Sequence, residues 1–400
     1  MKNAFKNVAA NEQHPNWENM ISRKTFLYKR EHDVRSDFER DYTRIIHCNA
    51  YRRLKHKTQV FFSPENDHIC TRIEHVNHVD SISYTIANYL GLNTELTKAI
   101  AVAHDLGHSP FGHAGEKILS RFSKRDLGIP FWHERNGLDF VDSIERLEDN
   151  DRCKQNLNLT YAVRDGIISH CGEIDENCVK PRTDFIDLSE YVYPNQFAPY
   201  TWEACVVKVC DKISYIGRDI EDAITLGILD SHLEELSSIL KNSIPGNKVN
   251  NTILINYFVS DLCENSSPDK GLCFSDTAFS LLNKVKAFNY ANIYFSDRLQ
   301  PSIRYFDLVL SEIYEKLKSC FDGENTLVRL NSLCFSFPNL GKSFCNFMNL
   351  FFGLPDNSSD LSDFDFSLCS FDVFVRCVLF YVSGMTDNFA LEVFQEIVGF

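Results

Sequence analysis

Residues 99–116 of the chain read AIAVAHDLGHSPFGHAGE, an apolar stretch that ends in a histidine–aspartate pair and passes into a turn. Apolar residues recur here at the three- and four-residue spacing of one helix face, and Asn93 stands where it can cap the helix. They are Leu96, Ala99, Ile100 and Ala103. The helix is therefore predicted to end at His104 and Asp105, with His108 and His113 in the turn that follows.

Two more helices are predicted on either side of this stretch. One follows His75 and stops at Gly91, because glycine readily takes the left-handed conformation that ends a helix. The other runs roughly from residue 202 to residue 223 and carries Asp211. Their inward-facing residues are Val79, Ile82, Ile86 and Leu90 in the first, and Val206, Val209, Cys210, Ile213 and Ile220 in the second. Strand signals are weak, so a mainly α fold is predicted.

Histidines and aspartates of these three helices form a candidate metal site. The predicted ligands are His75, His104, Asp105 and Asp211. Imidazole nitrogen and carboxylate oxygen suit Mn²⁺, Fe²⁺, Co²⁺, Zn²⁺ or Mg²⁺. A lone carboxylate such as Asp211 would also be costly to bury in an apolar helix without a cation. Spacing alone leaves open a second interpretation, in which these are capping residues and core histidines with ordinary hydrogen-bond partners.

A polar stripe continues along the helix from Asp211. It contains Tyr215, Asp219 and Asp222, flanked by Lys212 and Arg218. Hydroxyl and carboxylate groups suit the sugar of a nucleotide, and cations suit its phosphates. The basic run YRRLKHKTQ at residues 51–59, with Arg72, would offset the repulsion between an acidic protein and a polyphosphate. A solvated polar or basic surface is the alternative for both features.

The composition limits the class of protein. In 400 residues, 41 basic and 55 acidic side chains give a net charge of −14, which argues against a protein that coats nucleic acid. We expect no signal peptide and no membrane span, and 14 scattered cysteines indicate reduced thiols in a cytoplasmic protein. Changes in composition suggest an N-terminal arm (1–34), a core rich in His, Asp and Arg (35–230) and a helical C-terminal region (231–400), packed on the core and in an oligomer interface.

Blocks along the chain carry a family likeness, and the most specific is HDLGHSPFGHAGE at residues 104–116. Others lie at residues 35–54, 58–61, 67–75, 211–223, 255–266, 286–294 and 384–390. Together they resemble the deoxyguanosine triphosphate triphosphohydrolase family of the HD-domain superfamily. The resemblance implies an all-α HD-domain helical fold with a helical C-terminal extension. It also implies metal-dependent hydrolysis of a deoxynucleoside triphosphate to deoxynucleoside and triphosphate, with dGTP as the expected substrate.

The resemblance assigns roles to single residues. It implies that His75, His104, Asp105 and Asp211 hold one divalent ion. Mn²⁺ or Mg²⁺ is expected, and Fe²⁺, Co²⁺ and Zn²⁺ are the alternatives. Residues that match contacts to phosphate or deoxyribose are Gln59, Arg72, Lys212, Tyr215 and Asp219, with Arg53 a weaker candidate. His108, His113 and His133 match active-site histidines. Because the 5′-oxygen is a poor leaving group, a general acid is required, and His133 oriented by Glu134 is predicted to supply it. His108 or His113 would then hold the phosphate or the water.

Some consequences of the resemblance stay open at this point. The chain has His133-Glu134-Arg135-Asn136-Gly137 where the bacterial family usually has His-Asn-x-Gln-Ser, which puts base preference in doubt. Relatives form homo-oligomers, often hexamers, and a homo-oligomer is expected here. Some relatives bind single-stranded nucleic acid, which the net charge disfavours. The alternatives are an HD-type phosphohydrolase acting on monophosphates, cyclic dinucleotides or alarmones, and a nucleotide-sensing subunit without catalysis.

Overall fold

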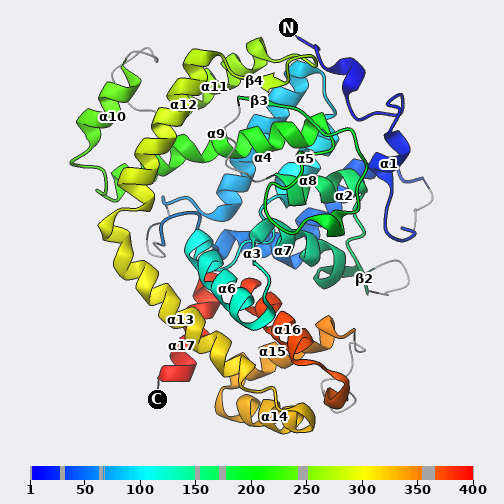
Figure 1. Ribbon diagram of the computed structural model, residues 1–400, viewed down its shortest axis with the longest axis vertical. Helices are drawn as coiled ribbons and strands as arrows, with labels where there is room; N and C mark the ends of the chain where they lie inside the picture. The colour runs from blue at the N-terminus through cyan, green and yellow to red at the C-terminus, as the bar shows by residue number, and fades with distance from the viewer. Residues whose placement is uncertain are drawn as a thin grey trace.

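The computed structural model describes residues 2–27, 32–62, 66, 68–148, 154–170, 177–241, 251–353 and 365–399. Helices dominate, as predicted (Figure 1). The helices of the first half are α1 Trp17–Ile21, α2 Asp37–His47, α3 Asn49–Arg53, α4 Arg72–Leu90, α5 Thr94–Ala103, α6 Gly112–Leu127, α7 His133–Asp139 and α8 Tyr161–Ser169. Those of the second half are α9 Trp202–Thr225, α10 Leu233–Leu240, α11 Asn251–Asn265, α12 Asp276–Asn289, α13 Gln300–Lys318, α14 Thr326–Ser336, α15 Pro338–Phe351, α16 Phe371–Ser383 and α17 Asp387–Val398.

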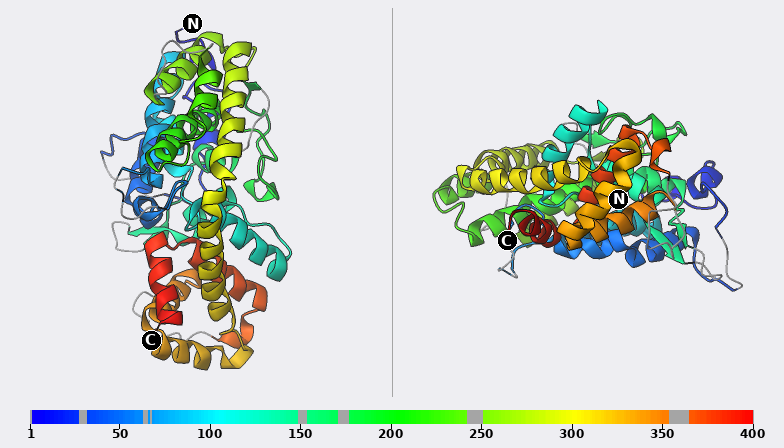
Figure 2. Two further views of the ribbon diagram at one scale, coloured as in Figure 1. Left: turned by 90° about the vertical axis from the view of Figure 1, so that its left-hand side faces the viewer. Right: turned by 90° about the horizontal axis from the view of Figure 1, so that it is seen from below.

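The molecule is elongated, and its helices form an upper and a lower group. In the upper group α4 packs against α5 and α9 (Figure 1). Helix α8 also packs against α5 and α9. In the lower group α13 contacts α16 and α17, while α15 joins α14 and α16. The chain passes from one group to the other along α13, a connection that is visible from the side in Figure 2.

Two hydrophobic clusters correspond to this division. The first gathers buried residues from Phe5 to Ile293, and the second joins part of α6 to residues from Phe306 onwards. The packing thus changes between Ile293 and Phe306, later in the chain than the change in composition at residue 231. Phe5 and Met20 lie in the first cluster, so the N-terminal segment packs onto the core.

The three helices that were predicted around the histidine–aspartate pair are confirmed, and their ends have local causes. His108 lies in the predicted turn, but the prediction for His113 is wrong, because His113 is already in the first turn of α6. Asn93 Oδ1 accepts hydrogen bonds from the backbone of Glu95 and Leu96, which caps α5. Gly91 takes φ 82°, which ends α4 as predicted. Thr201 caps α9 by accepting from the nitrogen of Ala204. No helix within the described ranges is long and apolar enough to cross a lipid bilayer.

Short antiparallel strands supplement the helices. The pairs are β1 Arg146–Glu148 with β2 Lys154–Asn156, and β3 Cys178–Val179 with β4 Leu272–Cys273. Cys178 and Cys273 face each other in the register of the second pair and form a disulfide. The prediction that all cysteines are reduced is therefore wrong at this pair. Ten other cysteines within the described ranges are free, and most of them are buried, as predicted.

Candidate metal centre and active site

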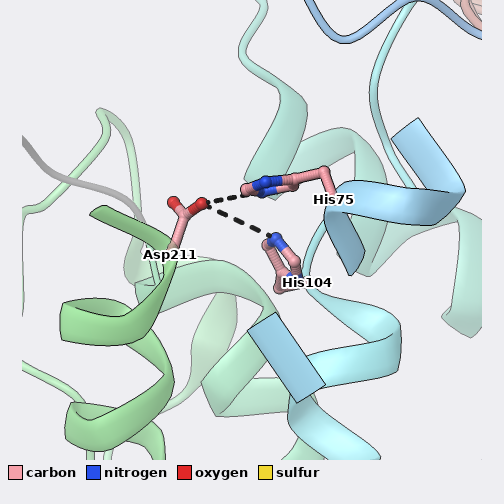
Figure 3. A group of neighbouring side chains, drawn as sticks. All are labelled: His75, His104 and Asp211. Carbon is pink, nitrogen blue, oxygen red and sulfur yellow. Dashed lines mark hydrogen bonds and ion pairs between the residues drawn. The ribbon is translucent and has the colours of Figure 1, made fainter. Parts of the chain in front are cut away.

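His75 is placed by the way α4 begins. The side chain of Glu74 accepts a hydrogen bond from the backbone nitrogen of Thr71, and the Thr71 side chain caps the helix in return. This capping box starts the helix at Arg72 and puts His75 in its first turn. His75 is buried, and its Nδ1 lies 3.4 Å from the hydroxyl of Ser214 on α9. The other ring nitrogen, Nε2, faces Asp211 (Figure 3).

His104 stands at the C-terminal end of α5, one residue beyond its last regular turn. Its Nδ1 lies 2.6 Å from the carbonyl oxygen of Ala101 and can only donate to it. The ring is therefore held in the tautomer that leaves a lone pair on Nε2. Nε2 of His104 is buried and has no hydrogen-bond partner among the described residues. A histidine that binds a metal ion typically has one ring nitrogen held by a carbonyl or carboxylate and the other nitrogen unprotonated, as His104 has here.

Three of the predicted ligands form one group, which α4, α5 and α9 bring together (Figure 3). Nε2 of His75 lies 3.0 Å from Oδ1 of Asp211, and Nε2 of His104 lies 3.9 Å from the same oxygen. Asp105, the fourth predicted ligand, lies at the edge of this group. Its carboxylate oxygens are 3.8 Å from Nε2 of His75 and 3.6 Å from Nε2 of His104.

The donor set fits a divalent cation. His75 and Asp211 form a hydrogen bond of 3.0 Å, but the other nitrogen–oxygen distances in the set exceed hydrogen-bond length. Nε2 of His104 in particular lacks a partner in the described chain. Burial would raise the pKa of Asp211, but the hydrogen bond and charge of His75 hold it well below its usual range. Burial would lower the pKa of His75, but the hydrogen bond and charge of Asp211 outweigh it and raise this pKa. The metal-free site thus holds a proton between His75 and Asp211, and a metal ion bound there would take the place of that proton.

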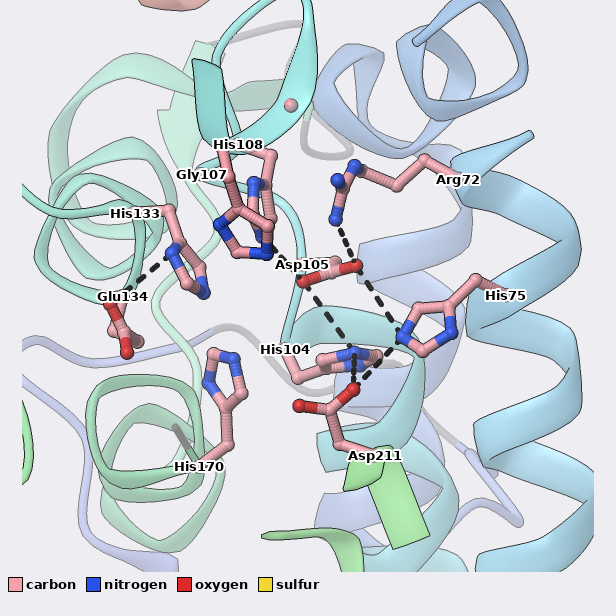
Figure 4. A network of polar contacts seen from close by, with 12 residues as sticks. Arg72, His75, His104, Asp105, Gly107, His108, His133, Glu134, His170 and Asp211 are labelled. Carbon is pink, nitrogen blue, oxygen red and sulfur yellow. Dashed lines mark hydrogen bonds and ion pairs between the residues drawn. The ribbon is translucent and has the colours of Figure 1, made fainter. Parts of the chain in front are cut away.

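Asp105 is held by two further side chains (Figure 4). NH1 of Arg72 donates to Oδ2 of Asp105 across 2.7 Å, and Nε2 of His108 lies 3.0 Å from Oδ1. Burial would raise the pKa of Asp105, but the nearby imidazoles of His104 and His108 and the Arg72 guanidinium keep it well below its usual range. Burial lowers the pKa of His108, and the charge of Arg72 lowers it further, so His108 is neutral at physiological pH.

Glu116 joins two of the predicted histidines. Its Oε1 lies 3.1 Å from Nδ1 of His133, and its Oε2 lies 3.2 Å from Nδ1 of His113. Glu134, the predicted partner of His133, is slightly farther away, at 3.4 Å from the same nitrogen. Burial would lower the pKa of His133, but the charges of Glu134 and Glu116 outweigh it and raise the pKa to about 10. Glu116 was not predicted from the sequence, although its place three residues after His113 on one helix was a usable signal.

Gly107 explains why α7 lies so close to the histidine–aspartate turn. A Cβ atom at Gly107 would come within 2.1 Å of the backbone oxygen of His133, so only glycine fits. His133 consequently stacks on His108, with ring centroids 3.8 Å apart. His170, which was also missed, closes the other side, 5.0 Å from the His104 ring and 5.4 Å from the His133 ring. Like His104, it stands at the end of an apolar helix.

Two residues that were predicted to contact the sugar are Asp219, on α9, and Gln59, on the segment before α4. Asp219 is buried, and the hydroxyl of Tyr294 donates to its Oδ2 across 2.6 Å. Burial raises the pKa of Asp219 to about 7. Gln59 is buried too; its backbone oxygen accepts from Arg72, and its side-chain Oε1 has no partner in the described part of the chain. That oxygen is a buried hydrogen-bond acceptor left unsatisfied by the described residues.

The remaining predicted contacts differ in position. Lys212 and Tyr215 are half-buried on α9, in the turns next to Asp211. Arg53 instead forms an ion pair of 2.7 Å with Glu145. Its guanidinium also lies over the ring of Phe140. Arg53 therefore has structural partners, and a contact with substrate stays a prediction.

Comparison with known proteins agrees with this geometry. The family model described as the HD domain matches residues 72–216, from the start of α4 through most of α9. A deoxyguanosinetriphosphate triphosphohydrolase-like protein of Caldanaerobacter subterraneus subsp. tengcongensis is 33% identical over 365 residues, which cover 91% of this chain and 86% of the relative. A protein of the same name from Rickettsia felis is 31% identical over 386 residues, with 91% and 92% covered. One from Desulfatibacillum aliphaticivorans is 34% identical over 293 residues, with 70% and 73% covered.

The chain belongs to the deoxyguanosinetriphosphate triphosphohydrolase-like family of HD-domain proteins. The family resemblance and the all-α HD fold that the sequence predicted are thereby confirmed. The chain is a hydrolase of the phosphohydrolase type, and its His and Asp side chains can hold a metal ion.

In this family member the C-terminal region reaches the segments around the candidate active site. Asp387, at the start of α17, accepts hydrogen bonds from the backbone nitrogens of Thr58 and Phe111 at 2.8 and 2.9 Å. The ammonium group of the buried Lys57 donates to the carbonyls of His108 and Ser383. The turn after the histidine–aspartate pair is thus tied to distant residues, since Phe111 and Asp387 are 276 positions apart in the chain. These contacts could not be predicted from local sequence patterns.

Proposed function

We propose that this chain hydrolyses a deoxynucleoside triphosphate, dGTP in the first instance, at the α-phosphate, and releases the deoxynucleoside and intact triphosphate. The observation that supports this most is the placement of the His75, His104 and Asp211 group beside histidines that share a carboxylate. When bound there, a divalent ion, for which we propose Mn²⁺ or Mg²⁺, supplies Lewis-acid polarisation of a phosphoryl oxygen. The other steps fall to side chains of this chain.

Charge on the phosphates calls for fixed cations in an acidic protein. The Arg72 guanidinium is buried and held by Asp105 and by the carbonyl of Gln59, so its position is set before substrate arrives. Lys212, one residue after Asp211 on α9, adds a second cation. We assign both to the phosphoryl oxygens, where preorganised charge stabilises the transition state.

His108 is better suited to hydrogen-bond a water molecule than a phosphate oxygen. Its Nε2 faces the Asp105 carboxylate and so carries the proton. Its Nδ1 has no partner among the described residues and remains an acceptor. An acceptor nitrogen can orient an attacking water, whereas it would repel an anionic oxygen.

The proton for the 5′-oxygen of the leaving nucleoside comes from His113 in this proposal. The sequence pointed to His133, but the two histidines share Glu116 and differ in access. The His113 side chain is 65% exposed and can meet a substrate, while His133 is buried and stacked on His108. A general acid of this kind is worth about 10²–10⁴ in rate.

Product analysis tests the function directly. Incubation of the purified chain with dGTP and Mn²⁺ or Mg²⁺, followed by anion-exchange chromatography, should yield deoxyguanosine and triphosphate in equal amounts. Stepwise release of phosphate would support an HD-type phosphohydrolase of another specificity. Binding of dGTP without any product under either metal would support the nucleotide-sensing alternative. A panel of the four deoxynucleoside triphosphates then gives the base preference.

A further inference from the structure

Two half-buried cysteines face each other in the lower group of helices. Cys334 lies near the end of α14 and Cys345 in the middle of α15, and their Sγ atoms are 3.5 Å apart. Of the ten free cysteines within the described ranges, the other eight are buried. Among those ten, Cys334 and Cys345 are therefore the thiols most open to a reagent in solution.

A glycine brings the two helices together at this point. A Cβ atom at Gly341 would come within 2.5 Å of the Cα atom of Cys334, so α15 crosses α14 where no side chain fits. Cys345 follows Gly341 by four residues and lies on the same face of α15. The close crossing thus places the thiol of Cys345 beside that of Cys334.

The connection between α14 and α15 holds this arrangement in place. Phe337 alone separates the two helices. Its backbone nitrogen donates to the carbonyl of Leu333 across 2.7 Å, and its carbonyl accepts from the nitrogen of Gly341 across 2.8 Å. A disulfide bond is about 2.05 Å long, so the two sulfur atoms need to approach by roughly 1.5 Å more. Rotation of the two side chains supplies a movement of this size without a change elsewhere in the fold.

Helix α14 lies at the edge of the lower group (Figure 1). It packs chiefly on α15 and on the turn Gly323–Asn325. Its buried residues are Thr326, Leu330 and Leu333. A helix that buries so few side chains opens more easily than a helix of the core. A covalent link to α15 would restrain this opening.

We propose that Cys334 and Cys345 form a thiol–disulfide exchange site, which a small-molecule disulfide such as oxidised glutathione converts to a bond that ties α14 to α15. One cysteine thiolate attacks a sulfur of the oxidant, breaks its S–S bond and releases one glutathione thiolate. The other cysteine thiolate then attacks the mixed disulfide, forms the Cys334–Cys345 bond and releases the second glutathione. The two cysteines lose two electrons and two protons, and two molecules of reduced glutathione carry them away.

Cys320 is the alternative partner for either cysteine. It is buried at the end of α13, and its thiol donates to the carbonyl oxygen of Lys316 across 3.6 Å. Burial raises the pKa of Cys320 to about 11, which makes its thiolate rare at neutral pH. The sulfur–sulfur contact favours the pair of Cys334 and Cys345, and Cys320→Ser is the matched control.

Peptide mapping by mass spectrometry tests the exchange site on the full chain. The reduced protein is incubated in mixtures of reduced and oxidised glutathione, alkylated and cut with trypsin. The mixtures are mildly alkaline, because burial raises the pKa of the Cys345 thiol and exchange needs a thiolate. Trypsin cuts after Lys342, so the two cysteines fall in different peptides. A linked peptide should appear in the oxidising mixtures and disappear as reduced glutathione increases.

Single variants follow the two steps separately. Cys345→Ser should stop at a mixed disulfide between glutathione and Cys334, and Cys334→Ser at one between glutathione and Cys345. Cys320→Ser should form the linked peptide as wild type does. The wild-type map requires no variant, so a variant that fails to fold does not affect it.

Hydrogen exchange tests the restraint on α14. Its backbone amides should exchange at least about tenfold more slowly in oxidised than in reduced wild type, because the closed loop limits opening. The double variant Cys334→Ser/Cys345→Ser keeps the Cys178–Cys273 bond and should show no such difference in α14. No linked peptide at any glutathione ratio, a link to Cys320 instead, or equal exchange in both states of wild type overturns the proposal. The inference is independent of the proposed function, since none of these measurements involves a nucleotide.

Discussion

The carbonyl oxygen of Ala101 accepts a hydrogen bond from Nδ1 of His104 across 2.6 Å. This contact, made within one turn of the same chain segment, fixes which nitrogen of His104 faces Asp211 and Asp105. A helix end therefore does more than place the histidine–aspartate pair. It also sets the tautomer in which His104 can bind a cation, before any cation is present.

Asp211→Ala should remove the ion held with His75 and His104. We expect one Mn²⁺ fewer per chain than in wild type and a loss of activity of at least roughly 100-fold, because even an outer-sphere change costs 10–100-fold. Metal analysis of the desalted protein checks this. Asp276→Ala, an exposed aspartate on α12, serves as the control. Unchanged metal content in Asp211→Ala would show that Asp211 is not a ligand.

The substitution His113→Asn should lower kcat, and the loss should be larger for a substrate with a poorer leaving group. With dGTP we expect kcat to fall by about 10²–10⁴, because the 5′-oxygen then leaves without a proton. With bis(p-nitrophenyl) phosphate, whose leaving group is a stable anion, the loss should be less than about tenfold. If His133→Asn shows this dependence on the leaving group and His113→Asn does not, then His133 is the general acid.

The buried carboxyl of Asp219 should make stability fall as pH rises. Burial raises its pKa from 3.8 to about 7, so between these values the folded state holds a proton that the unfolded state has released. The free energy of unfolding should then decrease by at most about 1.4 kcal/mol per pH unit through this window and level off above it. Urea unfolding of metal-free wild type and Asp219→Asn checks this, since the variant lacks the group. A pH-independent difference between them would contradict the raised pKa.

The sugar contacts predict a preference for deoxyribose. Tyr215 and Asp219 lie one turn apart on α9, and a 2′-hydroxyl would crowd that face. We expect kcat/KM for dGTP to exceed that for GTP, by up to roughly 100-fold. Tyr215→Phe keeps the ring and should keep the preference, whereas Tyr215→Ala should relax it. Equal turnover of the two nucleotides by wild type would refute the steric argument.

Asp387 should stabilise the active-site turn from a distance. Asp387→Asn places an amide group where two backbone N–H groups point, and we expect the free energy of unfolding to drop by about 1–3 kcal/mol. Metal content should stay at the wild-type value while kcat falls, because the turn after Asp105 loses its anchor. Asp372→Asn, exposed on α16, is the matched control. Unfolding energies that do not differ between the two variants would rule out the anchoring role.

The sequence by itself determined the helices around His75, His104 and Asp211 and singled out these residues, with Asp105, as candidate metal ligands. Helix spacing and capping are local, so the apolar period and Asn93 or Gly91 suffice to predict them. The block at residues 104–116 likewise indicated the family, because its specific residues form one continuous stretch of sequence.

Only the tertiary structure decided which partners these residues have. Glu116 serves both His113 and His133, Tyr294 holds Asp219, and Asp387 anchors the turn. His170 meets Asp105 across a gap of more than sixty positions in the chain, which is the difference between their residue numbers. Such contacts depend on how helices pack, and packing leaves no periodic trace in the sequence of either partner.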